Sequence, residues 1–335
     1  MPLKMLYESD ADRTLLRDRK IAVIGYGNQG SAQAQNLRDA AYSVIVAELP
    51  GTAAYARALQ DGFQPLNAAE AAEEADIVHL LVQDGVQPSV YRDQIAERLH
   101  SGKALVFSHG FNIHYRQIIP ARDVDVYMVS PKGVGTQVRA QFLAGKGVPG
   151  LIAVHQDVSG KARELALAHA SAIGCGRLGI IETSFSAETE ADLFGEQAVL
   201  CGGLSELVRA GFDTLVEAGF QPEIAYFECL HEVKLIADLI YERGIAGMRD
   251  AISDTAEYGD LTRGRRIIDA HTRKEMKKVL MEIRNGSFAD EWIRENAEGR
   301  PAYTLQKKKD EQHLIEKTGK ALRQHMGLEE ENKRS

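Results

Sequence analysis

The stretch Lys20-Ile21-Ala22-Val23-Ile24-Gly25-Tyr26-Gly27-Asn28-Gln29-Gly30 decides how the first half of the chain folds. Residues 20–24 have the apolar pattern of a short buried strand, three glycines follow at once, and residues 31–37 have the spacing of a helix. A second apolar strand is predicted over residues 43–47. This order of strand, glycine turn, helix and strand is the context that the dinucleotide-binding fingerprint requires.

Each glycine of the turn has its own task in such a site. Gly25 permits the tight turn, Gly27 lets the backbone approach a pyrophosphate, and Gly30 lets the helix pack closely on the strand. The first turn of the helix then offers free N–H groups to the phosphates. We therefore expect a dinucleotide cofactor to lie against the residues of this turn, which are Gly25, Tyr26, Gly27, Asn28, Gln29 and Gly30.

Glu48 closes the second strand, eighteen residues after Gly30. A carboxylate at this place accepts hydrogen bonds from the adenine-ribose hydroxyls and repels a 2′-phosphate. Residues 49–54 contain no Arg or Lys that could hold that phosphate. The sequence therefore predicts a preference for NADH over NADPH. The alternative is that Glu48 points into solvent, in which case the choice of cofactor would be loose.

Strands and helices continue to alternate up to about residue 181. Further strands are predicted over residues 76–82, 104–107, 124–129, 150–154 and 177–181, with helices over 86–99 and 160–173. Apolar strands with helical crossovers indicate a mostly parallel, doubly wound sheet of the Rossmann type, covered on both faces. His109 and Lys132 follow strand ends, where such sheets bind their ligands, so both are candidate site residues.

The second half of the chain shows helical spacing and no strand pattern. Long helices are predicted over residues 192–218, 222–241 and 305–325, and Gly202-Gly203 would allow another backbone to approach closely. The predicted fold class is therefore α/β followed by all-α. We place a dinucleotide-binding domain at 1–182, a helical domain at 183–328 and a flexible tail at 329–335.

The helical half carries two pairs of acidic residues. Asp192 and Glu196, like Glu228 and Glu232, are four residues apart, which stacks two carboxylates on one helix face. No Lys or Arg lies between residues 178 and 208 to pair with the first set. Acidic side chains on a largely apolar face must be paired, protonated or bound to a cation, and these oxygen ligands suit Mg²⁺ or Mn²⁺. The alternative is that each pair is a solvated helix face.

Composition limits the class of protein. The 335 residues suffice for two domains, and 44% apolar with 26% charged residues is ordinary for a globular chain. A net charge of −8 argues against nucleic acid or an anionic membrane as a partner. Three cysteines without a CxxC motif, an N-terminus without an apolar signal core and the lack of a membrane-length apolar run favour a cytoplasmic location.

Together these motifs resemble the ketol-acid reductoisomerase (acetohydroxy-acid isomeroreductase) family in its short form. The acidic motif is the most specific part of the resemblance, whereas the glycine motif alone is not specific. The resemblance implies a knotted helical domain and a homodimer with shared active sites, which could associate further. The matching stretches run in family order at residues 25–32, 107–111, 131–133, 188–203, 225–241 and 253–259.

The resemblance also implies a metal and substrate site. Asp192 would bridge two Mg²⁺ ions, and Glu196 would bind one of them directly. Glu228 and Glu232, contributed by the partner subunit, would bind the other ion. Ser253, also from the partner, would hold the substrate carboxylate.

The implied reaction has two steps. An alkyl group of 2-acetolactate or 2-aceto-2-hydroxybutyrate migrates, and a nicotinamide then reduces the product to a 2,3-dihydroxy-3-methyl acid, in valine, leucine and isoleucine biosynthesis. Asp192, Glu196 and Glu232 would take part in catalysis, with Glu232 taking or relaying the alcohol proton. His109 and Lys132 would complete the polar site beside the nicotinamide, which Pro131 and Gly133 would also contact.

Three departures from the family pattern are visible. Val134-Gly135-Thr136 replaces the usual Pro-Gly-His, which puts the local loop shape in doubt, and Asp254 replaces the more frequent Asn beside Ser253. Glu48-Leu49-Pro50 stands where the family has a basic residue for the 2′-phosphate, which again favours NADH.

Two other functions are compatible with parts of the sequence. One is a β-hydroxyacid dehydrogenase or imine-type reductase, which needs no metal carboxylates. The other is a non-catalytic dinucleotide-sensing module.

Overall fold

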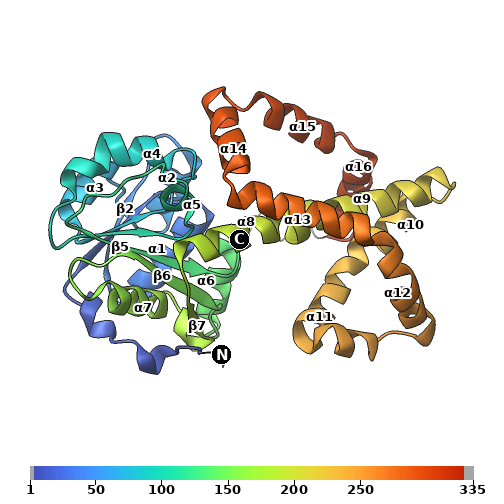
Figure 1. Ribbon diagram of the computed structural model, residues 1–335, viewed down its shortest axis with the longest axis horizontal. Coiled ribbons are helices and arrows are strands. Elements are labelled where there is room, and N and C mark those ends of the chain that lie inside the picture. The colour runs from blue at the N-terminus through green and yellow to red at the C-terminus, as the bar shows by residue number, and fades with distance from the viewer. Residues whose placement is uncertain (1–3, 328–335) are drawn as a thin grey trace. The chain divides into compact units, whose positions relative to one another are not determined.

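The computed structural model describes residues 4–327, and the chain forms two compact units, Met1–Ala191 and Asp192–Ser335. In the described part of the chain, every strand belongs to the first unit, and the second unit contains only helices (Figure 1). The predicted flexible tail, residues 329–335, lies outside the described residues. None of the described helices is both long and apolar enough to cross a membrane.

The first unit is built on one sheet of seven strands in the order β2-β1-β3-β4-β5-β6-β7. Neighbouring strands are parallel except β5 and β6, which run antiparallel, so the predicted mostly parallel sheet is confirmed. The strands are β1 (Lys20–Ile24), β2 (Ser43–Ala47), β3 (Ile77–Leu80), β4 (Ala104–Phe107), β5 (Asp125–Pro131), β6 (Gly150–Gln156) and β7 (Ile180–Glu182).

Helices cover both faces of this sheet. Successive residues of β4 show this, since Val106 packs into a cluster with Leu37 and Leu165, whereas Leu105 packs into a second cluster with Ile95. Burial on both faces is why the strands read as continuous apolar runs. The helices are α1 (Asn28–Asp39), α2 (Ala53–Gln60), α3 (Ala68–Glu74), α4 (Gln87–Val90), α5 (Phe111–His114), α6 (Gly135–Leu143) and α7 (Ala162–Ala172).

The second unit continues from helix α8, which begins in the first unit and runs on through Gly195. The predicted all-helical second half is confirmed for the described residues. Its helices are α8 (Phe185–Gly195), α9 (Gly202–Glu217), α10 (Pro222–Tyr226), α11 (Glu232–Arg249), α12 (Asp254–Ile267), α13 (Ala270–Arg284), α14 (Ser287–Ala297), α15 (Pro301–Glu311) and α16 (Leu314–His325).

The uninterrupted helix predicted over residues 192–218 is wrong. A π-helical turn follows α8 at Glu196–Leu200, and α9 begins only after Cys201. At Gly202 and Gly203 a Cβ atom would collide with a carbonyl oxygen five residues back in the chain. The two glycines therefore make room for the preceding turn of their own helix, and not for another segment of the chain as predicted.

Three other predicted helices are also divided. The helix predicted over residues 86–99 consists of α4, a π-helical turn at Tyr91–Ile95 and a 3-10 turn at Ala96–Arg98. The helix predicted over residues 222–241 consists of α10, a π-helical turn at Phe227–His231, and α11, which continues to Arg249. The helix predicted over 305–325 consists of α15 and α16. The two π-helical turns of the helical unit lie at the acidic pairs, and such turns are frequent at functional sites.

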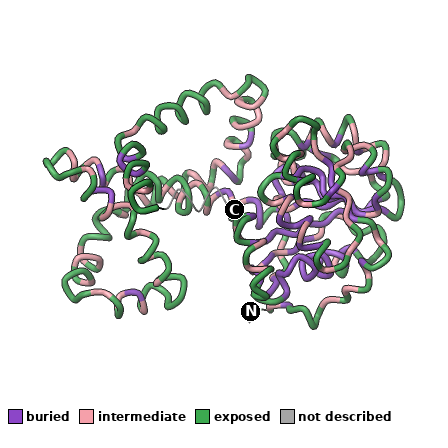
Figure 2. The backbone as a smooth tube through the Cα atoms, turned by 180° about the vertical axis from the view of Figure 1, so that it is seen from behind, coloured by how far each residue is buried: buried purple, intermediate pink, exposed green. Residues whose placement is uncertain are grey.

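The two units differ in how much of their apolar surface is buried. Buried backbone runs through the whole sheet unit, but in the helical unit it is confined to short stretches (Figure 2). The buried cluster of the helical unit consists of Phe212, Ala225, Tyr226 and Ile315. Large apolar side chains elsewhere in this unit are exposed, among them Leu235, Tyr241, Ile245, Leu261 and Ile267.

Candidate active site

The glycine turn has the geometry of a dinucleotide site. Gly25 adopts a φ of +102°, and a Cβ atom there would lie 2.8 Å from Val82 Cγ1. A Cβ atom on Gly30 would collide with the carbonyl oxygen of Gly25, so helix and turn can meet only at glycine. At Gly27, by contrast, nothing lies within 4 Å of the Cβ position, so a ligand can approach the backbone closely. These residues therefore fit a bound pyrophosphate.

Glu48 lies directly beside this turn. Its Oε2 accepts a hydrogen bond from Tyr26 N at 2.7 Å, and its Oε1 accepts one from Leu49 N at 2.8 Å. The carboxylate is thus held at the carboxyl end of β2 and does not simply point into solvent. A basic residue also reaches this region from α2, because Arg57 Nη2 donates to Tyr26 O at 3.0 Å. The sequence prediction looked for a basic residue only within residues 49–54 and therefore did not include Arg57.

The loop after β5 packs against the same helix. Gln29 Nε2 donates to Gly133 O at 2.8 Å, which joins the first turn of α1 to the Pro131-Lys132-Gly133 segment. A Cβ atom on Gly135 would collide with the carbonyl oxygen of Asn28. Glycine is therefore required at position 135, which begins α6 and is the one residue of Val134-Gly135-Thr136 that agrees with the family's Pro-Gly-His.

For Glu188 the sequence leaves two roles open, support of the neighbouring metal ligands or a favourable charge at the helix N-terminus. In the structure this buried carboxylate of α8 joins the loops after β4 and β5. Its Oε1 accepts hydrogen bonds from Ser130 Oγ and Lys132 Nζ, each at 2.9 Å. Its Oε2 accepts one from Gly110 N at 3.2 Å and lies 3.2 Å from His109 Nδ1. The side chain of Glu188 is only 1% exposed. His109 and Lys132, predicted separately, are thus brought together by one carboxylate.

Glu188 is ionised at neutral pH in this environment. Burial opposes its charge, but the hydrogen bond and charge of His109 and the neighbouring Lys132 ammonium outweigh burial and lower the pKa of Glu188 to about 2. The carboxylate accepts three hydrogen bonds and has His109 Nδ1 3.2 Å away, which leaves little room for a further ligand. Glu188 is therefore suited to hold His109 and Lys132 and poorly suited to bind a metal ion.

Asp192 follows Glu188 by one turn of the same helix. His109, Glu188 and Asp192 each offer one potential ligand atom, and these atoms lie within 4.8 Å of one another. Because the oxygens of Glu188 already accept three hydrogen bonds and one of them lies beside His109 Nδ1, Asp192 is the carboxylate of this group that fits a cation. The neighbouring Glu190 has a different setting, since its Oε1 lies 3.7 Å from His114 Nε2.

The other predicted metal ligands lie on the surface of a single chain. Glu196 begins the first π-helical turn of the helical unit, Glu228 belongs to the second, and Glu232 begins α11. All three are exposed, so the expectation that both pairs have apolar surroundings is wrong for one chain. Among the described residues, the ligand-distance group found around Asp192 contains none of Glu196, Glu228 and Glu232.

Ser253 has a local structural role. It is the N-cap of α12, and its Oγ accepts a hydrogen bond from Ala256 N at 3.3 Å. Asp254 occupies the first turn of that helix, where its charge complements the helix dipole. Both residues are exposed in the single chain. The role of Ser253 in binding a substrate carboxylate stays a prediction.

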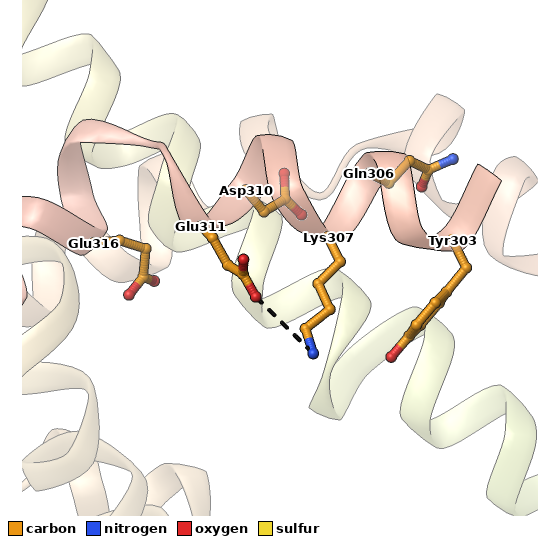
Figure 3. Close-up of a pocket in the computed structure, with 6 residues that line it drawn as sticks. All are labelled: Tyr303, Gln306, Lys307, Asp310, Glu311 and Glu316. Carbon is orange, nitrogen blue, oxygen red and sulfur yellow. Dashed lines mark ion pairs between the residues drawn. The ribbon is translucent and has the colours of Figure 1, made fainter. Parts of the chain in front are cut away.

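A cavity of about 370 Å³ in the helical unit is not a credible site. Figure 3 shows its lining side chains, most of them along α15, with an ion pair of 3.9 Å between Lys307 and Glu311. Every lining residue is exposed, so the cavity offers no buried polar group to a ligand. The lining residues are Tyr303, Gln306, Lys307, Asp310, Glu311 and Glu316.

Comparison with known families matches nearly the whole chain. Residues 15–179 match the model of the acetohydroxy acid isomeroreductase NADPH-binding domain, and residues 185–328 match that of the ketol-acid reductoisomerase C-terminal domain. The solved structure of an NADH-preferring ketol-acid reductoisomerase from an uncultured archean is 48% identical, with a TM-score of 0.94 over 96% of this chain and 99% of that chain.

More distant structures share the fold alone. A semialdehyde dehydrogenase NAD-binding protein from Cupriavidus necator is 20% identical with a TM-score of 0.59, over 80% of this chain and 99% of that chain. The pyrroline carboxylate reductase of Plasmodium falciparum is 16% identical with a TM-score of 0.51, over 81% and 98% of the two chains.

Proposed function

The chain belongs to the ketol-acid reductoisomerase family of oxidoreductases, and on that premise we propose that it isomerises 2-acetolactate or 2-aceto-2-hydroxybutyrate and reduces the product. The products are 2,3-dihydroxy-3-methyl acids of branched-chain amino-acid biosynthesis. Family membership removes the two competing readings, the dehydrogenase without metal carboxylates and the non-catalytic sensing module.

The observation that carries the proposal is the arrangement around Glu188. This ionised, buried carboxylate holds the Lys132 ammonium and the His109 imidazole at the carboxyl ends of the strands, one helical turn from Asp192. A positive charge and a hydrogen-bonding imidazole are thereby fixed where an oxygen-rich substrate would meet the nicotinamide. Lys132 and His109 orient the substrate oxygens and stabilise the negative charge that develops on them.

The proposed metal ligands are Asp192 and Glu196 of one chain, with Glu228 and Glu232 of the partner chain. Carboxylate oxygens fit Mg²⁺, and residues 178–208 around Asp192 and Glu196 contain no Lys or Arg. The exposure of Glu228 and Glu232 in a single chain fits ligands that await a second chain. Two bound Mg²⁺ ions would lower the pKa of the substrate hydroxyl and polarise the adjacent carbonyl. Glu232 would take or relay the proton of that hydroxyl.

NADH is the proposed reductant. Glu48 is anchored by two backbone N–H groups at the end of β2. A carboxylate at this place accepts hydrogen bonds from the ribose hydroxyls and repels a 2′-phosphate. The preference of the archaeal relative for NADH supports the same choice. Arg57 is the nearby cation that could moderate the repulsion, but its guanidinium is engaged with Tyr26 O.

A homodimer is the proposed functional unit. The helical unit leaves large apolar side chains exposed, including Tyr241 at 84%, Ile267 at 60% and Ile245 at 57%. Exposed apolar area of this kind in one part of a chain indicates a surface that another chain covers. In a twofold dimer each chain would supply Glu228, Glu232 and Ser253 to the active site of its partner.

The proposed reaction is tested by following NADH oxidation with 2-acetolactate, with and without Mg²⁺, and identifying the product by NMR. We expect 2,3-dihydroxy-3-methylbutanoate to form only when both Mg²⁺ and NADH are present. The same assay with NADPH should give the lower kcat/KM. Formation of the product without a divalent cation, or no reaction of NADH with 2-acetolactate, would refute the proposal.

A further inference from the structure

A buried polar cluster, made of Gln33, His79 and Ser108, lies beneath the loop that carries His109. Ser108 Oγ accepts a hydrogen bond from Gln33 Nε2 at 3.1 Å and lies 3.0 Å from His79 Nε2. Gln33 and His79 are fully buried, on helix α1 and strand β3. Polar side chains in an apolar sheet layer are costly unless they are hydrogen-bonded, so this cluster calls for a function.

The cluster continues along α1 to the loop after β5. Gln33 Nε2 also donates to Gln29 Oε1 at 3.2 Å, and Gln29 Nε2 donates to Gly133 O at 2.8 Å. One amide hydrogen of Gln33 therefore bonds to Ser108, in the loop after β4. The other bonds to Gln29, which in turn bonds to the loop after β5. The two loops that carry His109 and Lys132 meet at Glu188 on one side and are tied to α1 on the other.

The hydrogen bonds of the buried cluster meet at the Ser108 hydroxyl. Burial lowers the pKa of His79 well below its usual value, so its imidazole is neutral and has one donor and one acceptor nitrogen. Gln33 can only donate to the hydroxyl through its amide group. The Ser108 hydroxyl therefore accepts from Gln33 and either donates to or accepts from His79 Nε2, and it can satisfy both at once.

We infer that Ser108, held between Gln33 and His79, is a positioning residue that couples the cofactor helix α1 to the orientation of His109. The inference rests on the proposed function for the role of His109. A dinucleotide bound at the first turn of α1 would fix this helix, and the Gln33–Ser108 hydrogen bond would transmit that restraint to the turn at 108–110. Ser108 does not itself contact the reacting atoms.

Kinetics of Ser108→Ala provide the first test. We expect kcat with NADH and 2-acetolactate to fall about five- to tenfold, the loss typical of one hydrogen bond, while KM for NADH stays within about twofold. Ser171→Ala is the matched control, because Ser171 is a buried serine of α7 whose Oγ has no hydrogen-bond partner within residues 4–327. This control should retain wild-type kinetics.

Variants of His79 provide a rescue test. His79→Leu removes the partner of Ser108 and should resemble Ser108→Ala, whereas His79→Gln places an amide near the Nε2 position and should restore most of kcat. The double variant Ser108→Ala with His79→Leu should be little worse than either single variant, because both remove one interaction.

Hydrogen exchange tests the coupling without turnover. Adding NADH to the wild-type protein should slow exchange in the peptide that covers residues 108–114, and Ser108→Ala should lose this protection while Ser171→Ala keeps it. This result would stand even if 2-acetolactate were not the substrate. Equal protection in wild type and Ser108→Ala, equal losses of kcat in Ser108→Ala and Ser171→Ala, or no rescue by His79→Gln would each overturn the inference.

Discussion

Replacing Glu188 with Gln should destabilise the first unit by roughly 3 kcal/mol at neutral pH. The pKa of Glu188 is lowered from 4.5 to about 2 in the folded chain, and each unit of pKa shift corresponds to about 1.4 kcal/mol. Glutamine keeps the shape but turns an NH₂ group toward donors, either Ser130 and Lys132 or Gly110 and His109. Loss of one member of a buried charge pair typically costs about 3–5 kcal/mol, which agrees with the value obtained from the pKa shift.

The pH dependence of this loss has a definite sign. Because folding depresses the pKa of Glu188, its stabilisation is complete above the unfolded value of 4.5 and is lost as the pH falls toward about 2. The difference between wild type and Glu188→Gln should therefore shrink over that range. This difference in unfolding free energy is measured by urea unfolding between pH 7 and 2.5. Hydrogen exchange of peptides from β4 and β5 reports on the first unit alone.

Glu182→Gln is the control for this measurement. Glu182 pairs with Arg163 at 2.8 Å on the surface, where an ion pair contributes at most about 1 kcal/mol. The control should stay close to wild type at every pH. A Glu188→Gln variant within about 0.5 kcal/mol of wild type at pH 7, or a loss that does not change with pH, would refute the reasoning.

Three further substitutions test the cofactor and metal sites. Gly30→Ala should weaken NADH binding by at least about tenfold, because its Cβ would collide with Gly25 O, and wild-type affinity in a fluorescence titration would contradict this. Glu48→Gln should raise the kcat/KM ratio of NADPH to NADH by about tenfold or more, since it removes the negative charge beside the ribose, and an unchanged ratio would show that Glu48 does not select the cofactor. Asp192→Asn should abolish the Mg²⁺-dependent isomerisation while NADH affinity stays within about twofold, and near-normal turnover of 2-acetolactate would exclude Asp192 as a metal ligand.

The strands and the glycine turn could be predicted because their signals are local. The strands are short and mostly apolar, and β1, β2 and β4 have the predicted limits. The π-helical turns could not be predicted in this way, because a spacing argument assumes an unbroken period of 3.6 residues. Inserting a π turn shifts this period, which is why the helix predicted over residues 192–218 was wrong.

The role of Glu188 could not be decided from the sequence, because its partners are distant in the sequence. Ser130 and Gly110 lie 58 and 78 residues away, and only the fold brings the ends of β4 and β5 to one helix face. One signal was nevertheless available, since Glu188 precedes Asp192 by four residues and shares its helix face. The knotted path of the helical domain, the domain limits at 182 and 328 and the roles of the partner residues stay predictions.

The sharing of one metal site by two chains can be tested most directly with a mixed dimer. Chains carrying Asp192→Asn and chains carrying Glu232→Gln would be coexpressed with different affinity tags, and the dimer containing one of each would be purified. If Asp192 of one chain works with Glu232 of its partner, one of the two sites in this dimer is intact. We therefore expect about half of the wild-type turnover of NADH and 2-acetolactate, although each variant alone is inactive. A mixed dimer as inactive as its parents would contradict the shared site.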